Sequence, residues 1–296
     1  MDKKVTIKDV AREAGVSVAT VSYIMNNRED VKIGAETRKK VLQIANLLNY
    51  TPSSTAKSLA TGRNNIIGIS YRLNEKTLSR NLELIGFTKL LTERLDRLGY
   101  DVLFLPVNPS DESIHVRHNI DGIIAIDLSS TEFKSFSDRY LVPIIAVDML
   151  VQDDLFYQVY TNLQDSIKKL MSNDAQTVLV TDPYSNELYM ESITSSADKE
   201  RLFLLTDFDA EKGKFLDGKK LLSIGTLPAM MLSPYISSKD ITVIGDKSMC
   251  KSLPSGVKII ENENEKKANM AINLLLNAID HKFDVKHTYG IDLEAD

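Results

Sequence analysis

From Ile66 onward, short runs of β-branched and other apolar residues alternate with stretches of helical periodicity. Runs that are apolar throughout are typical of strands buried on both faces, and helical crossovers between such strands make a sheet parallel. The alternation therefore predicts an α/β body, and its length favours two parallel sheets over one. The expected strands are residues 66–71, 102–107, 122–127, 143–148, 177–182, 202–206, 221–225 and 241–245.

An amphipathic helix is expected between the first two of these strands. Apolar residues recur there at helical spacing, and Gly99 is placed to end the helix. The predicted inner face of this helix consists of Leu84, Phe87, Leu91, Leu95 and Leu98.

Before residue 66 the pattern is helical only. Thr6 can cap a helix over 7–14, Gly15 can end it, and Ser17 can cap a second helix over 18–25. A third helix is expected over 35–49, with Pro52 beyond its end. The predicted inner residues of these three helices are Val10, Ala11, Val16, Val21, Ile24, Val41, Leu42, Ile44, Ala45 and Leu48.

Charge divides along the same boundary. Residues 1–63 hold 11 Lys and Arg against 6 Asp and Glu, a net charge of +5, whereas the remainder holds 25 against 35, a net charge of −10. A small basic head on a large acidic body indicates a head that meets a polyanion. Chance clustering of charges on solvated helices is the alternative.

Several classes of protein are disfavoured by what the sequence lacks. It has no apolar run near the ~18 residues of a membrane helix and no apolar stretch at its start that would suit a signal peptide. Its one cysteine, Cys250, suits a reducing cytoplasm. No dinucleotide, phosphate-loop or nucleophile-elbow motif indicates an enzyme or a cofactor, and His115 and His118 have no third residue nearby that would complete a metal site.

The sequence at 5–22 is VTIKDVAREAGVSVATVS, and Asn26 follows it. These residues resemble the N-terminal signature of the lactose/galactose repressor (LacI/GalR-type) family of bacterial transcriptional regulators, and the resemblance continues with later landmarks of that family. It implies a helix-turn-helix DNA-binding domain at 1–50, a hinge helix or linker at 51–65, and a two-lobed periplasmic-binding-protein-like body at 66–296. It also implies a homodimer that binds a palindromic operator in duplex DNA, as a repressor. The later landmarks are Glu36-Thr-Arg38, Leu48-Asn-Tyr50 with Pro52, and Ala56-Lys-Ser-Leu59.

By this resemblance, the second helix reads bases in the major groove through Val18, Ala19, Thr20 and Tyr23. Val18 and Ala19 offer apolar surface suited to thymine methyl groups, although packing within the head is the alternative for both. Tyr23 stands where many family members carry an arginine that contacts guanine. The residues that resemble phosphate contacts are Thr6, Ser17, Ser22, Asn26 and Tyr50.

The linker resembles the minor-groove element of the family through Ala56, Lys57 and Leu59. The family's leucine at this place wedges between base pairs and kinks the duplex, and two such wedges require two chains side by side. The alternative is that Leu59 packs on its own body.

The body departs from the family where an effector would bind. The family's arginine after the fifth body strand is absent, with Tyr189 in its place, and its Asn-Asp pair and aromatic turn are also replaced. Asp148, Asn162, Thr226 and Asp246 remain pocket candidates because they end strands that face the cleft, but each is equally suited to capping a loop.

Three hypotheses follow for the body. It binds a small-molecule effector, as inducer or corepressor; or its pocket has degenerated and the regulator has no such effector; or the chain is a cytoplasmic small-molecule carrier without DNA control. A carrier has no use for a basic helix-turn-helix head, so residues 1–63 argue against the third hypothesis. The choice between a dimer and a tetramer stays open.

Overall fold

The computed structural model describes residues 5–26, 28, 31–50, 62–108, 119–207 and 216–294. The chain divides into two compact units, Met1–Asn64 and Asn65–Asp296. In the part of the chain described, no helix combines the length and apolar character needed to cross a membrane.

The first unit is a three-helix domain. Its helices surround a small core that includes Val10, Val21 and Val41, each fully buried. Gly15 ends the first helix with a φ of 68°, a left-handed conformation that glycine adopts without strain. Leu42, predicted to face inward, is instead exposed because it lies on the outer side of its helix. The helices are α1 (Ile7–Ala14), α2 (Val18–Met25) and α3 (Ala35–Leu47).

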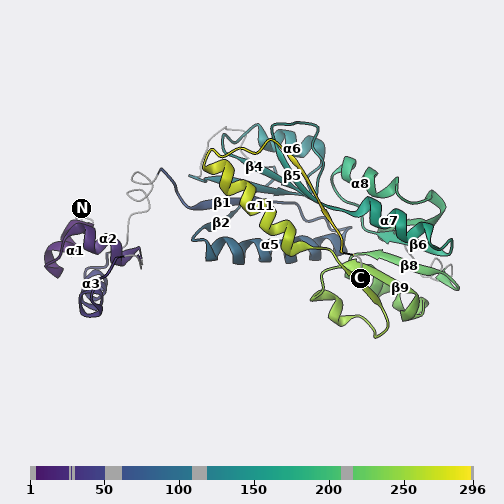
Figure 1. Ribbon diagram of the computed structural model, residues 1–296, viewed down its shortest axis with the longest axis horizontal. Helices are drawn as coiled ribbons and strands as arrows, with labels where there is room; N and C mark the ends of the chain where they lie inside the picture. Colours follow the sequence, from purple (N-terminus) through teal and green to yellow (C-terminus); the bar gives the residue numbers. More distant parts are fainter. Residues whose placement is uncertain are drawn as a thin grey trace. The chain divides into compact units, whose positions relative to one another are not determined.

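The second unit begins with a lobe built on a six-stranded parallel sheet of order β11-β5-β4-β3-β1-β2, called lobe 1. One face of the sheet is covered by α5 and α11, and the other by α6 (Figure 1). Its elements are β1 (Ile66–Ser70), α5 (Leu78–Arg97), β2 (Asp101–Phe104), β3 (Gly122–Ile126), α6 (Ser130–Ser137), β4 (Ile144–Val147), β5 (Tyr157–Asn162), α11 (Asn264–Ile279) and β11 (Thr288–Asp292).

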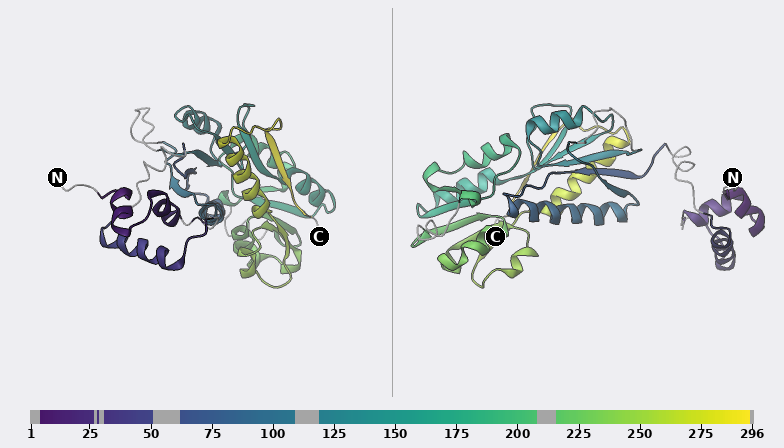
Figure 2. Two further views of the ribbon diagram at one scale, coloured as in Figure 1. Left: turned by 60° about the vertical axis from the view of Figure 1, so that its left-hand side comes forward. Right: turned by 180° about the vertical axis from the view of Figure 1, so that it is seen from behind.

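Lobe 2 is built on a five-stranded parallel sheet of order β10-β9-β8-β6-β7. Helices α7 and α8 cover one face and α10 the other, as the two views of Figure 2 also show. Its strands are β6 (Thr177–Thr181), β7 (Leu202–Leu204), β8 (Lys220–Ile224), β9 (Ile241–Gly245) and β10 (Lys258–Glu261); its α-helices are α7 (Leu163–Ser172), α8 (Glu187–Thr194) and α10 (Thr226–Leu232). Short 3-10 turns span Lys199–Arg201, Leu205–Asp207, Ser233–Tyr235, Ser238–Asp240 and Met249–Ser252.

The two predicted parallel sheets are confirmed, and each expected strand has a counterpart within a few residues. Three strands were not predicted: β5, β10 and β11. Two of these are edge strands, where one side of the strand is exposed and the apolar run is interrupted. Leu98, predicted on the inner face of α5, follows the last turn of that helix and is exposed.

Close packing around Gly68 gives a test of lobe 1. A Cβ at this position in β1 would lie 2.5 Å from Leu105 Cδ1 and 3.3 Å from Ile123 Cγ1, so Gly68→Ala must displace buried neighbours. We expect a loss of about 1–3 kcal/mol in the free energy of unfolding, measured by urea titration. Gly290→Ala in β11 is the matched control, because its Cβ would meet neighbours no closer than 3.5 Å. Equal stability of the two variants would contradict the described packing.

Candidate functional site

The outer side of α2 carries the predicted base-reading residues. Ser17 caps this helix, its Oγ accepting a hydrogen bond of 3.0 Å from the Thr20 amide. Val21 and Ile24 are buried in the core, whereas Val18 and Tyr23 are exposed to 40% and 36%. Ala19 is exposed as well. The alternative that Val18 and Ala19 pack in the core is therefore wrong, and α2 presents a mixed apolar and aromatic surface with Thr20 beside it.

The predicted phosphate contacts lie at helix ends and bond to their own helices. Thr6 Oγ1 donates to Asp9 Oδ2 at 2.7 Å, and this bond lowers the pKa of Asp9. Asn26 Nδ2 donates to the Ser22 carbonyl at 2.8 Å. Tyr50 follows α3 and is half-buried, which raises the pKa of its hydroxyl. Ser17 and Thr6 precede the first turns of α2 and α1, where backbone amides favour an anion.

Two groups of predicted residues lie outside the described residues. The first is the hinge group, Ala56, Lys57 and Leu59, and the second is the pair His115 and His118. Within the described ranges, no three His, Cys, Asp or Glu side chains are grouped as a metal site would require.

Two carboxylates join the lobes across the cleft between them. Asp182, directly after β6 in lobe 2, accepts through Oδ2 from the Ser79 amide at 2.8 Å, in the first turn of α5. Asp127, directly after β3 in lobe 1, accepts through Oδ1 from the Ser185 and Asn186 amides at 2.8 and 3.2 Å. Amides in the first turn of a helix, such as that of Ser79, and amides just before a helix, such as those of Ser185 and Asn186, have no acceptor within the helix, so these carboxylates satisfy them from the opposite lobe.

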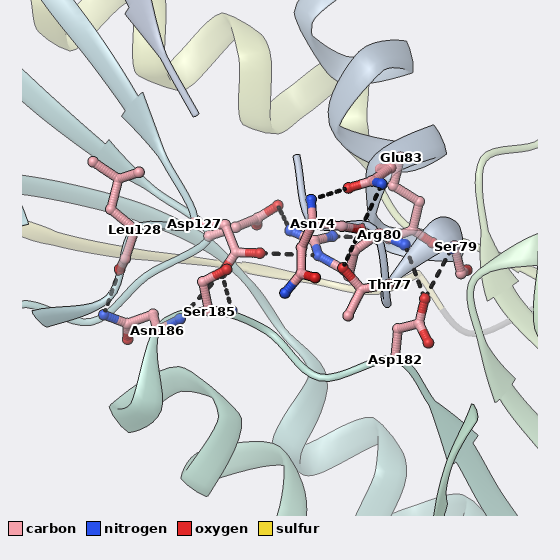
Figure 3. A network of polar contacts seen from close by, with 12 residues as sticks. Asn74, Thr77, Ser79, Arg80, Glu83, Asp127, Leu128, Asp182, Ser185 and Asn186 are labelled. Carbon is pink, nitrogen blue, oxygen red and sulfur yellow. Dashed lines mark hydrogen bonds and ion pairs between the residues drawn. The ribbon is translucent and has the colours of Figure 1, made fainter. Parts of the chain in front are cut away.

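The Arg80 guanidinium lies between these carboxylates (Figure 3). Its Nε donates to Asp127 Oδ2 at 3.1 Å, and its Nη1 donates to Glu83 Oε2 at 2.8 Å. Its Nη2 is 3.7 Å from Asp148 Oδ2. The guanidinium carbon is 3.9 Å from the centroid of the Tyr184 ring, in lobe 2. Arg80 is only 5% exposed, so a side chain of lobe 1 fills the centre of the cleft.

A second buried cation completes the cluster. Lys267, from α11, donates through Nζ to Asp148 Oδ1 at 2.8 Å and to Thr161 Oγ1 at 3.3 Å. The cavity that remains beside Arg80 and Lys267 has a volume of about 20 Å³, room for one or two water molecules. Binding sites for small organic ligands are typically ~300 Å³ or more, so this closed cleft has no space for a sugar.

Of the five predicted pocket residues, the structure brings only Asp148 to this cavity. Tyr189 is buried nearby and donates its hydroxyl to the Thr161 carbonyl at 2.6 Å, but it is not among the residues that line the cavity. The other three make local contacts: Asn162 Nδ2 donates to Asp292, Thr226 Oγ1 is 3.3 Å from Cys250 Sγ, and Asp246 Oδ1 accepts from the amides of Ser248 and Met249.

Sequence reasoning missed most of the cluster. Asp127 and Asp182 directly follow predicted strands, the same signal that selected Asp148, so both were within reach. Asp127 and Asp148 also share a left-handed backbone, with φ of 49° and 50°, a strain that often accompanies functional sites. Also missed were Arg80, Glu83 and Lys267, which lie in helices and follow no recognisable spacing, and Tyr184, which lies between β6 and α8.

Burial sets the protonation of the cluster. It raises the pKa of Asp127 to about 6, although the nearby Arg80 guanidinium acts in the opposite direction. Burial likewise raises the pKa of Glu83 and of Asp182. For Arg80, burial lowers the pKa, but Tyr184 and the carboxylates of Asp127 and Glu83 more than offset this effect and raise it. Arg80 therefore stays charged, while the raised pKa values of its hydrogen-bonded partners Asp127 and Glu83 lie closer to neutrality than those of ordinary carboxyl groups.

The raised pKa of Asp127 predicts a pH dependence of stability. A carboxyl group whose folded-state pKa is raised contributes stability that is present below its unfolded-state pKa and lost as pH rises through the folded-state value, here about 6. Asp127→Asn should remove this contribution, which changes by at most about 1.4 kcal/mol per pH unit. Melting temperatures followed by circular dichroism from about pH 4.5 to 7 should therefore vary less steeply in this variant.

Asp96→Asn is the control for this measurement, because it removes the same charge from a side chain that is exposed on α5. Its melting profile should follow that of the wild type. An Asp127→Asn profile that runs parallel to the wild-type profile would refute the assigned direction of the pKa shift.

Comparison with known proteins shows what this chain is similar to. Residues 6–53 match the family described as bacterial regulatory proteins, lacI family. The chain is 31% identical over 182 residues to the sucrose operon repressor of Klebsiella pneumoniae, which covers 58% of this chain and 52% of that protein. It is 26% identical over 304 residues to catabolite control protein A of Staphylococcus aureus (strain MRSA252), covering 95% of this chain and 89% of that protein. The match thus spans about half the length of the sucrose operon repressor.

The fold has solved counterparts. A crystal structure of the lac repressor dimer bound to operator and the anti-inducer ONPF superposes with a TM-score of 0.65 at 20% identity, covering 98% of this chain and 97% of that chain. At this identity the likeness concerns the fold alone. It confirms the expected helical head and two-lobed, periplasmic-binding-protein-like body. Residues 6–53 thus carry a lacI-type domain, and the chain as a whole is similar to bacterial regulatory proteins of the lacI family.

Proposed function

We propose that this chain is a sequence-specific DNA-binding transcriptional regulator, a repressor that acts in the cytoplasm rather than an enzyme. The observation that carries the proposal is the exposed face of α2, where Val18, Ala19 and Tyr23 project from a helix whose other side is buried. A helix of this kind fits the major groove, with its N-terminal residues on base edges. The match of residues 6–53 to bacterial regulatory proteins of the lacI family and the similarity to a sucrose operon repressor support the proposal.

The proposed division of the chain follows from this function. Residues 1–50 bind DNA, 51–65 form a hinge that reaches the minor groove through Ala56, Lys57 and Leu59, and 66–296 form the body. Phosphate contacts come from helix ends, among them Thr6, Ser17, Ser22, Asn26 and Tyr50. A palindromic operator requires two heads, so the active form is a homodimer.

Operator binding and its dependence on salt test the proposed function. Two heads bring ten net positive charges to the duplex, so affinity should fall ~10³-fold or more between about 50 and 200 mM salt. A site selected from random duplexes should bind ~10³-fold more tightly than a scrambled one, measured by fluorescence anisotropy. Equal affinity for both duplexes, or affinity that does not respond to salt, would remove the repressor proposal.

Tyr23 should determine part of the operator sequence. Its ring and single hydroxyl cannot make the bidentate contact to guanine that arginine makes, a contact worth about 1–3 kcal/mol of discrimination. Tyr23→Arg should therefore shift the preferred base toward guanine at one position in each half-site, measured by selection from random duplexes. Leu42→Arg adds the same charge at an exposed position of α3 and should leave the selected site unchanged. An identical consensus from wild type and Tyr23→Arg would contradict base reading by this residue.

An apolar strip on the body is proposed as the dimer surface. Leu78, Leu82 and Ile85 lie one turn apart on α5, and each is exposed by about half or more. Helix α10 packs against α5 and exposes Met230 and Met231. Contiguous exposed apolar side chains of this kind are typical of interfaces, and a two-fold dimer places the same strip on both partners.

Leu82→Glu should break this dimer. The substitution places two carboxylates in an apolar contact, because each subunit contributes one, and dimer dissociation should become easier by at least ~10-fold. Sedimentation velocity measures the change directly. Leu155→Glu is the control, since Leu155 is exposed in a loop of lobe 1 away from α5. A Leu82→Glu protein that remains dimeric at wild-type concentration would exclude this surface.

Control by a small-molecule effector remains the second candidate for the body. The solved lac repressor structure holds an anti-inducer, which supports an effector by analogy. The cleft of this chain argues against a sugar, because its cavity of about 20 Å³ lies among charged side chains of the protein itself. The departures from the family at Tyr189, Thr226 and Asp246 point the same way. We therefore favour a regulator in which a free hexose is not the effector.

A further inference from the structure

The centre of the interlobe cleft has the composition of a receptor for a guanidinium group. Carboxylates of Asp127 and Glu83 accept hydrogen bonds from two different nitrogens of Arg80, at 3.1 and 2.8 Å. The ring of Tyr184 lies 3.9 Å from the guanidinium carbon. Carboxylates at the edges and an aromatic ring at the face are the partners that a planar guanidinium prefers.

The occupant of this receptor links both lobes. Arg80 belongs to α5 of lobe 1, while Tyr184 belongs to lobe 2. Asp127, which binds Arg80 through one oxygen, uses the other to accept the Ser185 and Asn186 amides of lobe 2. Removing the guanidinium would therefore disturb contacts on both sides of the cleft.

The charges of the cleft make this occupant necessary for closure. Two buried cations, Arg80 and Lys267, face four acidic side chains. Glu83 is partly buried, and the other three are almost wholly buried. These three are Asp127, Asp148 and Asp182. Without Arg80 a single cation would face four carboxyl groups in a space from which water is largely excluded. Such an imbalance favours separation of the lobes, because separation returns water to the carboxylates.

One nitrogen of Arg80 lacks a hydrogen-bond partner, and this supports treating the guanidinium as a bound ligand of the cleft. Its Nη2 is buried and makes no hydrogen bond with any described residue, and Arg80 is among the residues that line the cavity of about 20 Å³. Its nearest acidic atom is Asp148 Oδ2, at 3.7 Å. The cavity beside Arg80 is large enough for a water molecule, and Nη2 still has a hydrogen bond to donate.

We propose that the interlobe cleft is a guanidinium-binding site whose occupant is Arg80 of the same chain, and that this internal ligand holds the lobes closed without a free effector. Lobe closure by Arg80 is a property of the body and does not require that the head bind DNA. Its consequence for operator affinity rests on the proposed function, because only there does lobe closure act on DNA.

Backbone amide exchange reports lobe closure directly. Four amides donate to a carboxylate of the opposite lobe. Asp182 accepts from the Ser79 and Arg80 amides in the first turn of α5. Asp127 accepts from the Ser185 and Asn186 amides before α8. Because the Ser79 and Arg80 amides lie in the first turn of α5, and the Ser185 and Asn186 amides precede α8, none of the four has an acceptor within a helix, and their protection depends on the closed cleft. Hydrogen–deuterium exchange of the full-length protein, read by mass spectrometry in peptides that contain them, measures closure.

Arg80→Ala should raise exchange in both peptides by about tenfold or more, whereas Arg97→Ala, on the exposed side of the same helix, should leave both unchanged. Millimolar methylguanidinium should restore protection in Arg80→Ala, and methylammonium at equal ionic strength should not. In wild type, neither compound should change exchange, because the site is filled. Unchanged exchange in Arg80→Ala, or increased exchange that methylguanidinium does not reverse, would overturn the proposal.

A second variant covers the case in which Arg80→Ala does not fold. Arg80→Ala with Asp127→Asn removes one cation and one carboxylate together, so the net charge of the cluster is preserved. This double variant should show increased exchange at the same two segments and weaker recovery with methylguanidinium, since a carboxylate partner is lost. Wild-type protection in the double variant would overturn the proposal.

Operator titration separates the two proposals. The affinity of Arg80→Ala for the selected operator should change severalfold on addition of methylguanidinium, whereas that of wild type should not. If wild type binds no duplex specifically, the DNA-binding function fails while the exchange measurements still decide whether Arg80 closes the cleft. If wild type binds its operator but the exchange and rescue results are negative, the internal ligand alone is refuted.

Discussion

The body depends on the burial of one guanidinium between two lobes. Removing a charged group from water costs several kcal/mol, and the cost is offset only where partners of opposite charge and good geometry surround it. Arg80 has Asp127 and Glu83 at hydrogen-bonding distance and the Tyr184 ring against its face. Asp127 has no solvent to replace Arg80 as its partner, because it is buried and its other oxygen already accepts an amide of lobe 2. Each member of the cluster is thus stabilised only while the others stay in place.

The fold of this chain follows closely from local sequence patterns where strands are buried on both faces. Strands β3 and β4 are apolar at every position and fully buried, so their residues could serve only as the centre of a sheet. Strands β5 and β11 were missed because Gln158, Thr161 and Gly290 interrupt their apolar pattern. Strand β10 was missed because only two apolar residues lie between its charged ends, Lys258 and Glu261. The three helices of the head were predictable because their caps, Thr6, Ser17 and Gly15, act over a few residues.

The cleft was far less predictable, since its chemistry depends on partners distant in the sequence. Asp127 and Arg80 are 47 residues apart, and Asp182 reaches the amide of Ser79 across 103 residues. An acid at the end of a strand signals the cleft edge, and this rule found Asp148. The same rule also selected Asp246, which only caps a turn, because position relative to a strand does not reveal which loops meet. No local pattern distinguishes Arg80 from an arginine exposed on the surface of a helix.

The chain leaves lobe 1, forms lobe 2 and then returns to lobe 1, and this path affects the order in which the lobes form during synthesis. The sheet of lobe 1 contains β11, and its buried face is covered by α11, yet both follow the whole of lobe 2 in the sequence. The head and lobe 2 can therefore each fold from a contiguous segment as it leaves the ribosome. Lobe 1 stays incomplete until α11 and β11 are synthesised, and until then one edge of β5 and one apolar face of its sheet are uncovered. A chain paused before residue 264 carries this exposed surface, which makes lobe 1 the part of the newborn protein most prone to aggregate.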